Sequence, residues 1–398
     1  MKIAVWYYLP SGGAKRALFD HVSGLVARGH HVEAFHPPAP HEDWLPLPCK
    51  EHVVSHGHVI GHGNYFQRVW KHIMRPTLAM KMMQDHSKEV AQLIEEGGFD
   101  VVFTNTCCQY HSPFLGRYTK KPKLLYLQEP NRFLYEALPR LAWIDAPEGA
   151  SWRRKLRTWF DLVALRQQAM AELTNAQSYD RILVNSYFSR ESVARCYGLD
   201  STVCYLGIDL GRLGSGSEPR ENYLLGVGAC VYPKRVKLAI EAVGQLPEPR
   251  PKLIWSANFI DDPYAEECKD LAQRLGVDFE LRELVPDDEL LVLMQRASCV
   301  LYVPRLEPFG YVPLEAAACG ASVVTVMEGG LRETMSEIGY LADPNPDSIA
   351  QQICRVLDDP SAAREKALAN IPAIHAQWGL EAATDRLEAH LLQITRRP

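Results

Sequence analysis

The sequence predicts an α/β protein built from two doubly wound domains. At 398 residues, the chain is longer than one hydrophobic core usually organises, so two domains are the natural expectation. Short continuous apolar runs, typical of strands buried on both faces of a parallel sheet, alternate with helical patterns. This alternation begins at residue 3 and begins again near residue 222. Each half is therefore expected to be Rossmann-like, with a cleft between the halves where ligands would bind.

The first half starts with the apolar run "IAVWYYL" (3–9), which "PSGG" interrupts. A helical pattern then places Leu18, Val22 and Leu25 on one face and stops at Gly29. The next strand is "HHVEAFH", and this strand–turn–helix–strand order predicts a parallel sheet. Further strands are expected at 100–105, 123–128 and 181–186, with long helical or irregular inserts at 64–97 and 151–178.

The second half repeats the pattern without a close sequence repeat. Strands are expected at 223–229, 252–257, 279–283, 299–304 and 322–326, with helices at 234–246, 264–275, 287–296 and from about 313. The Gly- and Ser-rich stretch 205–222 suits a linker. We therefore expect domains at 1–205 and 206–379, with the last helix, about 380–398, packed back on the first domain.

Composition excludes several classes of protein. The chain is 47% hydrophobic and 23% charged, as in ordinary globular proteins, and its net charge of -5 does not indicate nucleic-acid binding. Ten cysteines without a C-x-x-C pair fit a reducing cytosol. No run of 18 apolar residues is present, and the first residues indicate a strand and not a signal peptide. A cytoplasmic protein is expected.

The stretch "EPFGYVPLE" places two carboxylates, Glu307 and Glu315, around a strand-to-helix turn. Gly310 permits a tight turn, and Pro313 suits the start of a helix, whose free amides can bind phosphate. Carboxylates accept hydrogen bonds from sugar hydroxyls, so the pattern indicates a ligand with both phosphate and hydroxyls. The alternative is that Glu315 is a first-turn acid favoured by the helix dipole and Glu307 a surface loop residue.

A resemblance to a known family adds to this interpretation. "RLEPFGYVPLEAAACGASVVTVMEGGLRE" resembles the E-x7-E region of family 4 glycosyltransferases, which have the GT-B fold. "VGACVYPKRVKLAIEAV" is similar to the diphosphate-binding segment of that family, and "YLPSGGAKRAL" to its first glycine-rich loop. The resemblance covers nearly the whole chain and is stronger in the C-terminal half. It implies that 1–205 binds the acceptor and 206–379 the nucleotide sugar.

The resemblance also assigns roles on the donor side. Glu307 would bind donor sugar hydroxyls and stabilise positive charge at the anomeric carbon, while Glu315 would hold the ribose. Lys234 and Arg235 would neutralise the diphosphate; the alternative is a solvated basic pair, although a helix start is a poor place for cations without an anion. Other donor-binding positions are Phe309, Gly310, Tyr311, Val312, Gly12, Gly13 and, near the base, Val285.

The acceptor-side candidates are Gln128, Glu129, Arg132 and His111. Some family members have a histidine where Gln128 stands in "YLQEPNR"; glutamine can still hydrogen-bond a sugar hydroxyl but cannot titrate. Ala229 stands where many members have arginine, so the diphosphate site would depend on Lys234 and Arg235 alone. His111 would face the acceptor, with ordinary polar surface as its alternative.

We expect no metal and no cofactor. His52, His56, His58 and His62 lie among glycines without Cys or carboxylate partners, which favours a flexible surface loop over a zinc site. No D-x-D that would hold a metal-bound nucleotide sugar is found between strands. A bare "GG" without G-x-G-x-x-G disfavours a nicotinamide enzyme.

The segment 151–168 is basic and amphipathic. Leu156, Trp159, Phe160 and Val163 fall on one helical face, near Arg153, Arg154, Lys155 and Arg157. Helical periodicity favours a helix packed on the domain core. The alternative is a peripheral contact with the inner face of an anionic membrane that presents a lipid-linked acceptor.

The expected function is retaining, metal-independent transfer of a hexose from a UDP- or GDP-sugar to a hydroxyl of a glycan, a lipid-linked or a small-molecule acceptor. Retention is implied by the resemblance. The alternative is a non-catalytic GT-B protein that binds nucleotide sugar or glycan, to which Gln128 and Ala229 lend support. A phosphorylase or sugar epimerase on the same fold is a third option.

Overall fold

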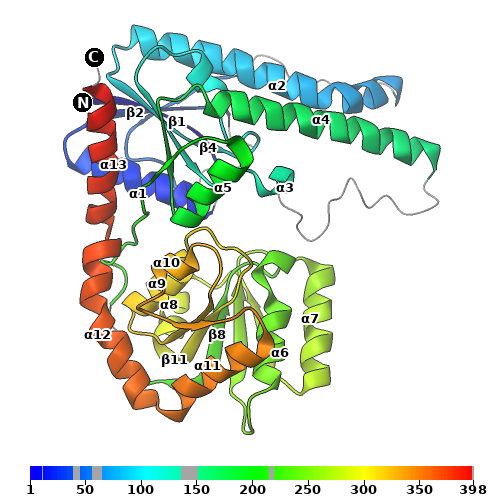
Figure 1. Ribbon diagram of the computed structural model, residues 1–398, viewed down its shortest axis with the longest axis vertical. Coiled ribbons are helices and arrows are strands. Elements are labelled where there is room, and N and C mark those ends of the chain that lie inside the picture. Colours follow the sequence, from blue (N-terminus) through cyan, green and yellow to red (C-terminus); the bar gives the residue numbers. More distant parts are fainter. Residues whose placement is uncertain (11, 39–44, 56–64, 136–150, 215–218, 397–398) are drawn as a thin grey trace. The chain divides into compact units, whose positions relative to one another are not determined.

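The computed structural model divides into two compact units. It describes residues 1–10, 12–38, 45–55, 65–135, 151–214 and 219–396, with the backbone alone for 65–76 and 153–157. The first unit contains Met1–Asn185, Ser189–Tyr205 and Ala383–Pro398, and the second contains Ser186–Phe188 and Leu206–Ala382. Both are α/β units, as the alternating patterns predict (Figure 1).

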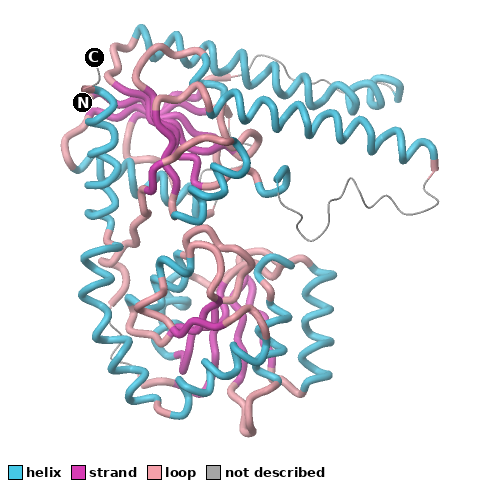
Figure 2. The backbone as a smooth tube through the Cα atoms, in the orientation of Figure 1, coloured by secondary structure: helices cyan, strands magenta, loops and turns pink. Residues whose placement is uncertain are grey.

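The first unit is built on a seven-stranded sheet in the order β3-β2-β1-β4-β5-β6-β7. Figure 2 shows the strands of each unit in magenta with helices around them in cyan. Every pair of neighbours is parallel. The strands are β1 (Lys2–Tyr8), β2 (His31–His36), β3 (Lys50–Val53), β4 (Val101–Cys107), β5 (Lys123–Gln128), β6 (Arg181–Val184) and β7 (Thr202–Val203). The chain order reverses direction between β1 and β4, so the switch point where such sheets bind ligands lies there.

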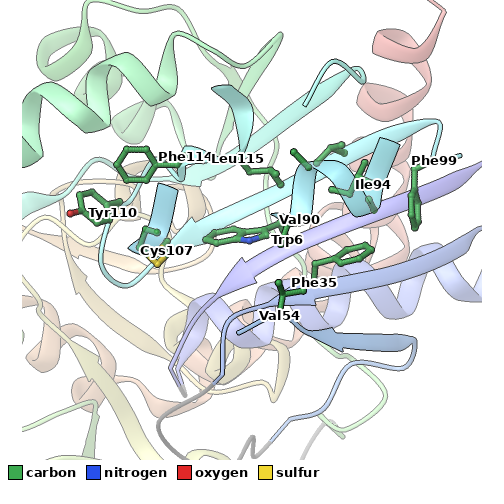
Figure 3. Close-up of a cluster of buried hydrophobic side chains, with 14 of the residues drawn as sticks. Trp6, Phe35, Val54, Val90, Ile94, Phe99, Cys107, Tyr110, Phe114 and Leu115 are labelled. Carbon is green, nitrogen blue, oxygen red and sulfur yellow. The ribbon is translucent and has the colours of Figure 1, made fainter. Parts of the chain in front are cut away.

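The helices of this unit are α1 (Gly13–Ala27), α2 (Tyr65–Glu96), η1 (Phe114–Arg117), α3 (Arg132–Tyr135), α4 (Trp152–Ala176), α5 (Tyr187–Tyr197), which begins in the second unit, and most of α13 (Leu380–Thr395). The long helices α2 and α4 lie side by side (Figure 1). One face of the sheet carries a hydrophobic core that includes Trp6, Phe35 and Phe114 (Figure 3). The last helix, α13, is held against the C-terminal end of α1. Glu388 of α13 accepts a hydrogen bond from Arg28, the residue after α1, at 2.6 Å and pairs with His30 at 2.6 Å.

The second unit is built on a six-stranded parallel sheet in the order β10-β9-β8-β11-β12-β13. Its strands are β8 (Glu221–Val227), β9 (Lys252–Ala257), β10 (Phe279–Glu283), β11 (Ala297–Tyr302), β12 (Val323–Val326) and β13 (Tyr340–Ala342). Its helices are η2 (Tyr232–Lys234), α6 (Val236–Gly244), α7 (Asp262–Leu275), α8 (Asp287–Arg296), α9 (Tyr311–Ala318), α10 (Leu331–Thr334), α11 (Pro346–Asp358) and α12 (Pro360–Trp378). The switch point of this sheet lies between β8 and β11.

Three strands of the two sheets were not predicted: β3, β7 and β13. Strand β3 is a four-residue edge strand with partly exposed and exposed side chains, so it lacks the apolar run that reveals the inner strands. The prediction of a loop at His52 was therefore wrong. The His52 ring lies in β3, stacks on Phe35 with 4.7 Å between centroids, and hydrogen-bonds Glu33 at 2.6 Å. His56, His58 and His62 lie outside the described residues.

Candidate functional site

Charged side chains meet at the carboxyl edge of the second unit's sheet. Lys234 and Arg235 follow β8, Glu307 follows the neighbouring strand β11, and Glu328 follows β12. Because these strands are parallel and adjacent, their following loops lie at one edge, and those after β8 and β11 flank the switch point. The backbone joins the first two loops directly, since Arg305 N–H donates to the carbonyl of Pro233 at 2.8 Å.

The Lys234 ammonium donates to Glu307 Oε2 at 2.8 Å. The two side chains are 28% and 20% exposed, so the ion pair is partly shielded from water. The ammonium also lies 5.7 Å from the centroid of the Tyr302 ring. Burial lowers the pKa of Lys234, but Tyr302 and Glu307 raise it by more, and the net pKa lies above its usual value. Lys234 is therefore a fixed cation at neutral pH.

A second ion pair stands beside the first. The Arg235 guanidinium donates to both carboxylate oxygens of Glu328, with 3.4 Å between Nη2 and Oε1. Arg235 itself has φ 53° and ψ 44°, and it joins the last residue of η2 to the first turn of α6. Glu328, which lies 93 residues away from Arg235 along the chain, is not among the predicted site residues.

Left-handed backbone gathers at the predicted site residues of both units. In the described part of the chain, the non-glycine residues with positive φ are Gln128, Arg235, Leu284 and Leu306. Gln128 ends β5, Leu284 follows β10 beside Val285, and Leu306 precedes Glu307. Such backbone costs about 1–3 kcal/mol per residue and is typical of functional sites.

Two glycines hold the Glu307 loop in place. Gly330 N–H donates to the Glu307 carbonyl at 2.8 Å. A Cβ added at Gly330 would lie 2.0 Å from the Pro308 oxygen, and one at Gly329, where φ is +57°, would lie 2.5 Å from the Glu307 oxygen. Only glycine fits there. These positions were not predicted as site residues, although "GG" after the buried run "SVVTV" is the signal that would have found them.

The helix after Glu307 starts earlier than predicted. Gly310, with φ 92°, precedes α9, whose first residue is Tyr311, so Pro313 is its third residue. Glu315 therefore lies in the second turn, and its assignment to the first turn was wrong. The helix-dipole explanation of Glu315 loses its basis, because that effect is confined to the first turn.

The neighbours of Glu307 are fixed by packing. The Phe309 ring is buried and contacts the rings of Tyr311 and Trp378, with centroids 5.4 and 5.7 Å away, and its carbonyl accepts from Thr334 at 3.0 Å. The Phe309 side chain thus belongs to the core, and only its backbone is placed to meet a ligand. Val312 and Val285 are partly exposed.

In the first unit, the predicted residues also gather at the carboxyl edge. Gly12, with φ 146°, caps α1 after β1, and Gly13 is the first residue of α1. His111 follows β4, and its Nδ1 lies 3.1 Å from the carbonyl oxygen of Glu129, which follows β5. The Gln128 amide donates to Asn105 at 3.4 Å, and Arg132 lies 3.5 Å from the Glu129 carboxylate. Strands β1, β4 and β5 are neighbours, so these residues flank this unit's switch point.

The segment 151–168 forms the first part of α4. Trp159 is 56% and Val163 37% exposed, so this apolar face is not buried in the core, and the prediction that it packs there was wrong. The side chains of Arg153, Arg154, Lys155, Leu156 and Arg157 lie outside the described residues. Within the described ranges, no helix has the length and apolar character needed to cross a membrane, and no three His, Cys, Asp or Glu side chains gather as a metal site.

Comparison with known families identifies the chain. Residues 11–212, about half of its length, match the model of Glycosyltransferase Family 4, and residues 212–371 match that of Glycosyl transferases group 1. The chain belongs to glycosyltransferase family 4. This glycosyltransferase therefore carries its ion pairs, Lys234–Glu307 and Arg235–Glu328, within the group 1 region.

Relatives of this glycosyltransferase span its whole length. The human alpha-1,3/1,6-mannosyltransferase ALG2 is 24% identical over 96% of this chain and 93% of its own. Sucrose-phosphate synthase from Thermosynechococcus elongatus has a TM-score of 0.73 at 17% identity, covering 99% of this chain and 98% of its own. Anabaena Alr3699/HepE, solved with UDP, has a TM-score of 0.69 at 16% identity, covering 99% and 100%. The structural likenesses establish the GT-B fold.

The predicted family, fold and enzyme class are thus confirmed. The protein is an enzyme that transfers a glycosyl group from a nucleotide-sugar donor.

Proposed function

We propose that this enzyme transfers a hexose from a UDP- or GDP-hexose to a hydroxyl with retention of anomeric configuration and without a metal ion. The main support for the proposal is two neighbouring ion pairs, Lys234–Glu307 and Arg235–Glu328, at the switch point of the second unit. Mannose is the first hexose to test, because the relative matched over 96% of the chain is named a mannosyltransferase.

The two cations suit the leaving group of this reaction. When the glycosidic bond to a nucleoside diphosphate breaks, negative charge develops on the diphosphate, and preorganised cations nearby stabilise it. Lys234 and Arg235 stand at the start of α6, where the dipole disfavours cations unless an anion is bound. They would supply the charge that a metal ion supplies in metal-dependent transferases.

The residues around Glu307 suit the sugar and ribose. The Glu307 carboxylate would bind hydroxyls of the hexose and stabilise positive charge at its anomeric carbon. The backbone at Gly310 and the first turn of α9 would meet phosphate, and Glu315 would accept from the ribose hydroxyls. For retention, the incoming hydroxyl would attack from the face that the diphosphate leaves, and a diphosphate oxygen would take its proton. Val285, after β10, would lie near the base.

The first unit would supply the acceptor side. Gly12 and Gly13, which open α1 beside β1, would bind the donor phosphates and also approach the acceptor, whereas Gln128, Glu129 and Arg132, at and after the end of β5, would face the acceptor. These groups offer amide, carboxylate and guanidinium partners suited to sugar hydroxyls. Because Gln128 does not titrate, we assign it hydrogen bonding and no proton transfer.

An exposed stripe on α4 supports a lipid-linked acceptor. Trp152, Trp159, Val163 and Met170 are 69%, 56%, 37% and 59% exposed, and their spacing of seven, four and seven residues puts them on one helical face. The sequence of this helix also holds five basic residues between 153 and 166, against the one acid Asp161. Aromatic and basic groups together suit the surface of an anionic bilayer, which would be the inner face of a cytoplasmic membrane.

The membrane contact is tested by sedimentation with vesicles of phosphatidylglycerol or of phosphatidylcholine alone. We expect the protein to sediment with the anionic vesicles and Trp159→Ser to weaken this at least several-fold. Leu93→Ser, a change at a 39% exposed leucine on α2, is the matched control. If both variants bind the anionic vesicles equally well, the exposed stripe on α4 is not a membrane-binding surface.

The reaction itself is tested by incubation with UDP- and GDP-linked glucose, galactose and mannose, with octyl hexosides as acceptors and EDTA present. We expect release of nucleoside diphosphate that depends on the acceptor, and an α-linked product from an α-linked donor by proton NMR. A β-linked product would overturn retention, and activity restored only by a divalent ion would overturn metal independence.

A further inference from the structure

The loop that carries His111 is held by buried polar groups. It follows β4 and precedes η1, and its backbone carbonyls accept hydrogen bonds from side chains below it. These bonds run from Thr106 to the His111 oxygen at 3.1 Å, from Asn175 to the Ser112 oxygen at 2.7 Å, and from Tyr179 to the Pro113 oxygen at 3.1 Å. These hydrogen bonds fix the conformation of the loop before any substrate arrives.

A buried carboxylate fixes the start of the loop. Glu172 of α4 has 0% of its surface exposed, and it accepts from the His111 N–H at 3.2 Å and from the Tyr197 hydroxyl at 3.0 Å. The Gln168 amide donates to it as well, at 3.2 Å. Burying a carboxylate is costly unless it is hydrogen-bonded, so these three donors and Glu172 stabilise one another. Glu172 is a positioning residue for His111.

The residues around His111 point into the core, whereas His111 does not. Tyr110 and Phe114 are 7% and 0% exposed and contact edge to face with 5.0 Å between centroids (Figure 3). Ser112 is fully buried. His111 is partly exposed between two buried neighbours, Tyr110 and Ser112, so the loop is anchored on both sides of its side chain.

The hydrogen bonding of the ring defines its tautomer. His111 Nδ1 lies 3.1 Å from the carbonyl oxygen of Glu129, and a carbonyl can only accept, so Nδ1 carries the hydrogen. In the neutral ring, Nε2 then has its lone pair exposed as an acceptor. No residue in the described part of the chain hydrogen-bonds to Nε2. An acceptor nitrogen held on a rigid loop matches a hydroxyl of an uncharged sugar.

We propose that His111 binds the sugar acceptor, with Nε2 accepting a hydrogen bond from one of its hydroxyls; this rests on the proposed function. Strands β4 and β5 pair in parallel, and the His111 ring bonds to the residue that follows Gln128. The ring thus reaches the same edge of the sheet from the neighbouring strand.

The decisive variant is His111→Asn. The asparagine amide can still donate to the Glu129 carbonyl but has no group at the place of Nε2. The acceptor is the octyl hexoside that the wild type uses fastest. We expect the KM for this acceptor to rise about tenfold, because the variant loses one hydrogen bond to a neutral partner. The donor KM and the slow donor hydrolysis without acceptor should stay unchanged. The control His31→Asn changes a histidine on exposed surface of the same unit and should leave every constant as in the wild type.

Two kinetic results would overturn the proposal. One is an unchanged acceptor KM in His111→Asn; the other is an equal loss of hydrolysis and transfer, which would mean a purely structural role. The tautomer is checked without activity, by long-range nitrogen–proton NMR of labelled wild type against His111→Asn, and a hydrogen on Nε2 in the neutral ring would also overturn it. If the wild type transfers no hexose at all, the proposed function fails first, and the substrate role of His111 fails with it.

Discussion

The Lys234 ammonium and the Glu307 carboxylate meet at 2.8 Å, 73 residues apart along the chain. They come from the loops after β8 and β11, the two strands between which the order of the second sheet reverses. The pair thus stands where parallel α/β sheets bind ligands. In the proposed reaction Lys234 would neutralise the leaving diphosphate and Glu307 would stabilise charge at the anomeric carbon, and the bond between those two parts of the donor is the one that breaks.

Glu328 should matter to catalysis although sequence analysis missed it. Glu328→Gln removes the negative charge that holds the Arg235 guanidinium, in a pair whose side chains are 21% and 20% exposed. We expect kcat/KM for the donor to fall about tenfold, from the misplacement of one transition-state cation. Steady-state kinetics at saturating acceptor measures this.

The control for Glu328 is Glu267→Gln. Glu267 of α7 also pairs with a basic side chain, Lys237. Its side chain is 61% exposed, whereas that of Glu328 is 20% exposed. Exposed pairs contribute little. Equal kinetics for both variants and the wild type would mean that Arg235 does not need its partner.

Gly330 should be irreplaceable for reasons of space. Gly330→Ala would bring a methyl group to 2.0 Å from the Pro308 oxygen, so the loop that carries Glu307 must move. A displacement of about 1 Å in a catalytic group can cost about a hundredfold in rate. We expect kcat to fall by about that factor, with a lowered melting temperature. Gly214→Ala, at a glycine with no atom within 4 Å of the added carbon, should change neither. Wild-type turnover in Gly330→Ala would show that the loop tolerates movement.

His21 should make stability depend on pH. It is 2% exposed between the rings of Phe103 and Tyr126, and in the described structure neither ring nitrogen has a hydrogen-bond partner. Burial, with a smaller effect of Arg386, lowers its pKa from 6.5 to about 3. Between those values the unfolded chain binds a proton that the folded chain does not. The free energy of unfolding should therefore fall by about 1.4 kcal/mol per pH unit as the pH drops below 6.5, until about 3.

His21→Leu removes this titration and the two unsatisfied nitrogens. We expect the variant to be at least as stable as the wild type at pH 7 and clearly more stable at pH 5, by urea unfolding at both values. His375→Leu, at an exposed histidine of α12, should track the wild type. A wild-type-like pH slope in His21→Leu would mean that His21 is not the source.

The sequence predicts the inner strands and several helices closely. The bounds of β5, β9, β10 and α8 agree with the prediction, and β5 and β9 are defined by continuous apolar runs. The edge strands β3 and β7 were not predicted, since they are short and half-exposed and have no apolar run, whereas the edge strand β10 alternates apolar and charged residues.

The predicted site is recovered only in part, for a related reason. Glu307 and Lys234 stand out through local sequence patterns, and Gly330 has a local signal in "GG" after a buried run, whereas Glu328 reaches the site only because β12 lies beside β11. Such contacts arise from strand order, which local patterns do not contain. The exposed face of α4 was mistaken for a core face because periodicity reports that a stripe exists and not what covers it.

The most direct test of the central claim compares Lys234→Met with Lys237→Met. Lys234 is the partly buried partner of Glu307, whereas Lys237, three residues on, pairs with an exposed acid at the surface. In a transfer assay with the donor that the wild type uses, Lys234→Met should lower kcat by about a hundredfold to a thousandfold, as expected for loss of one preorganised charge at the transition state. Lys237→Met should keep wild-type kcat, and both variants should melt as folded proteins. Wild-type turnover in folded Lys234→Met would contradict the assignment of this ion pair to the leaving diphosphate.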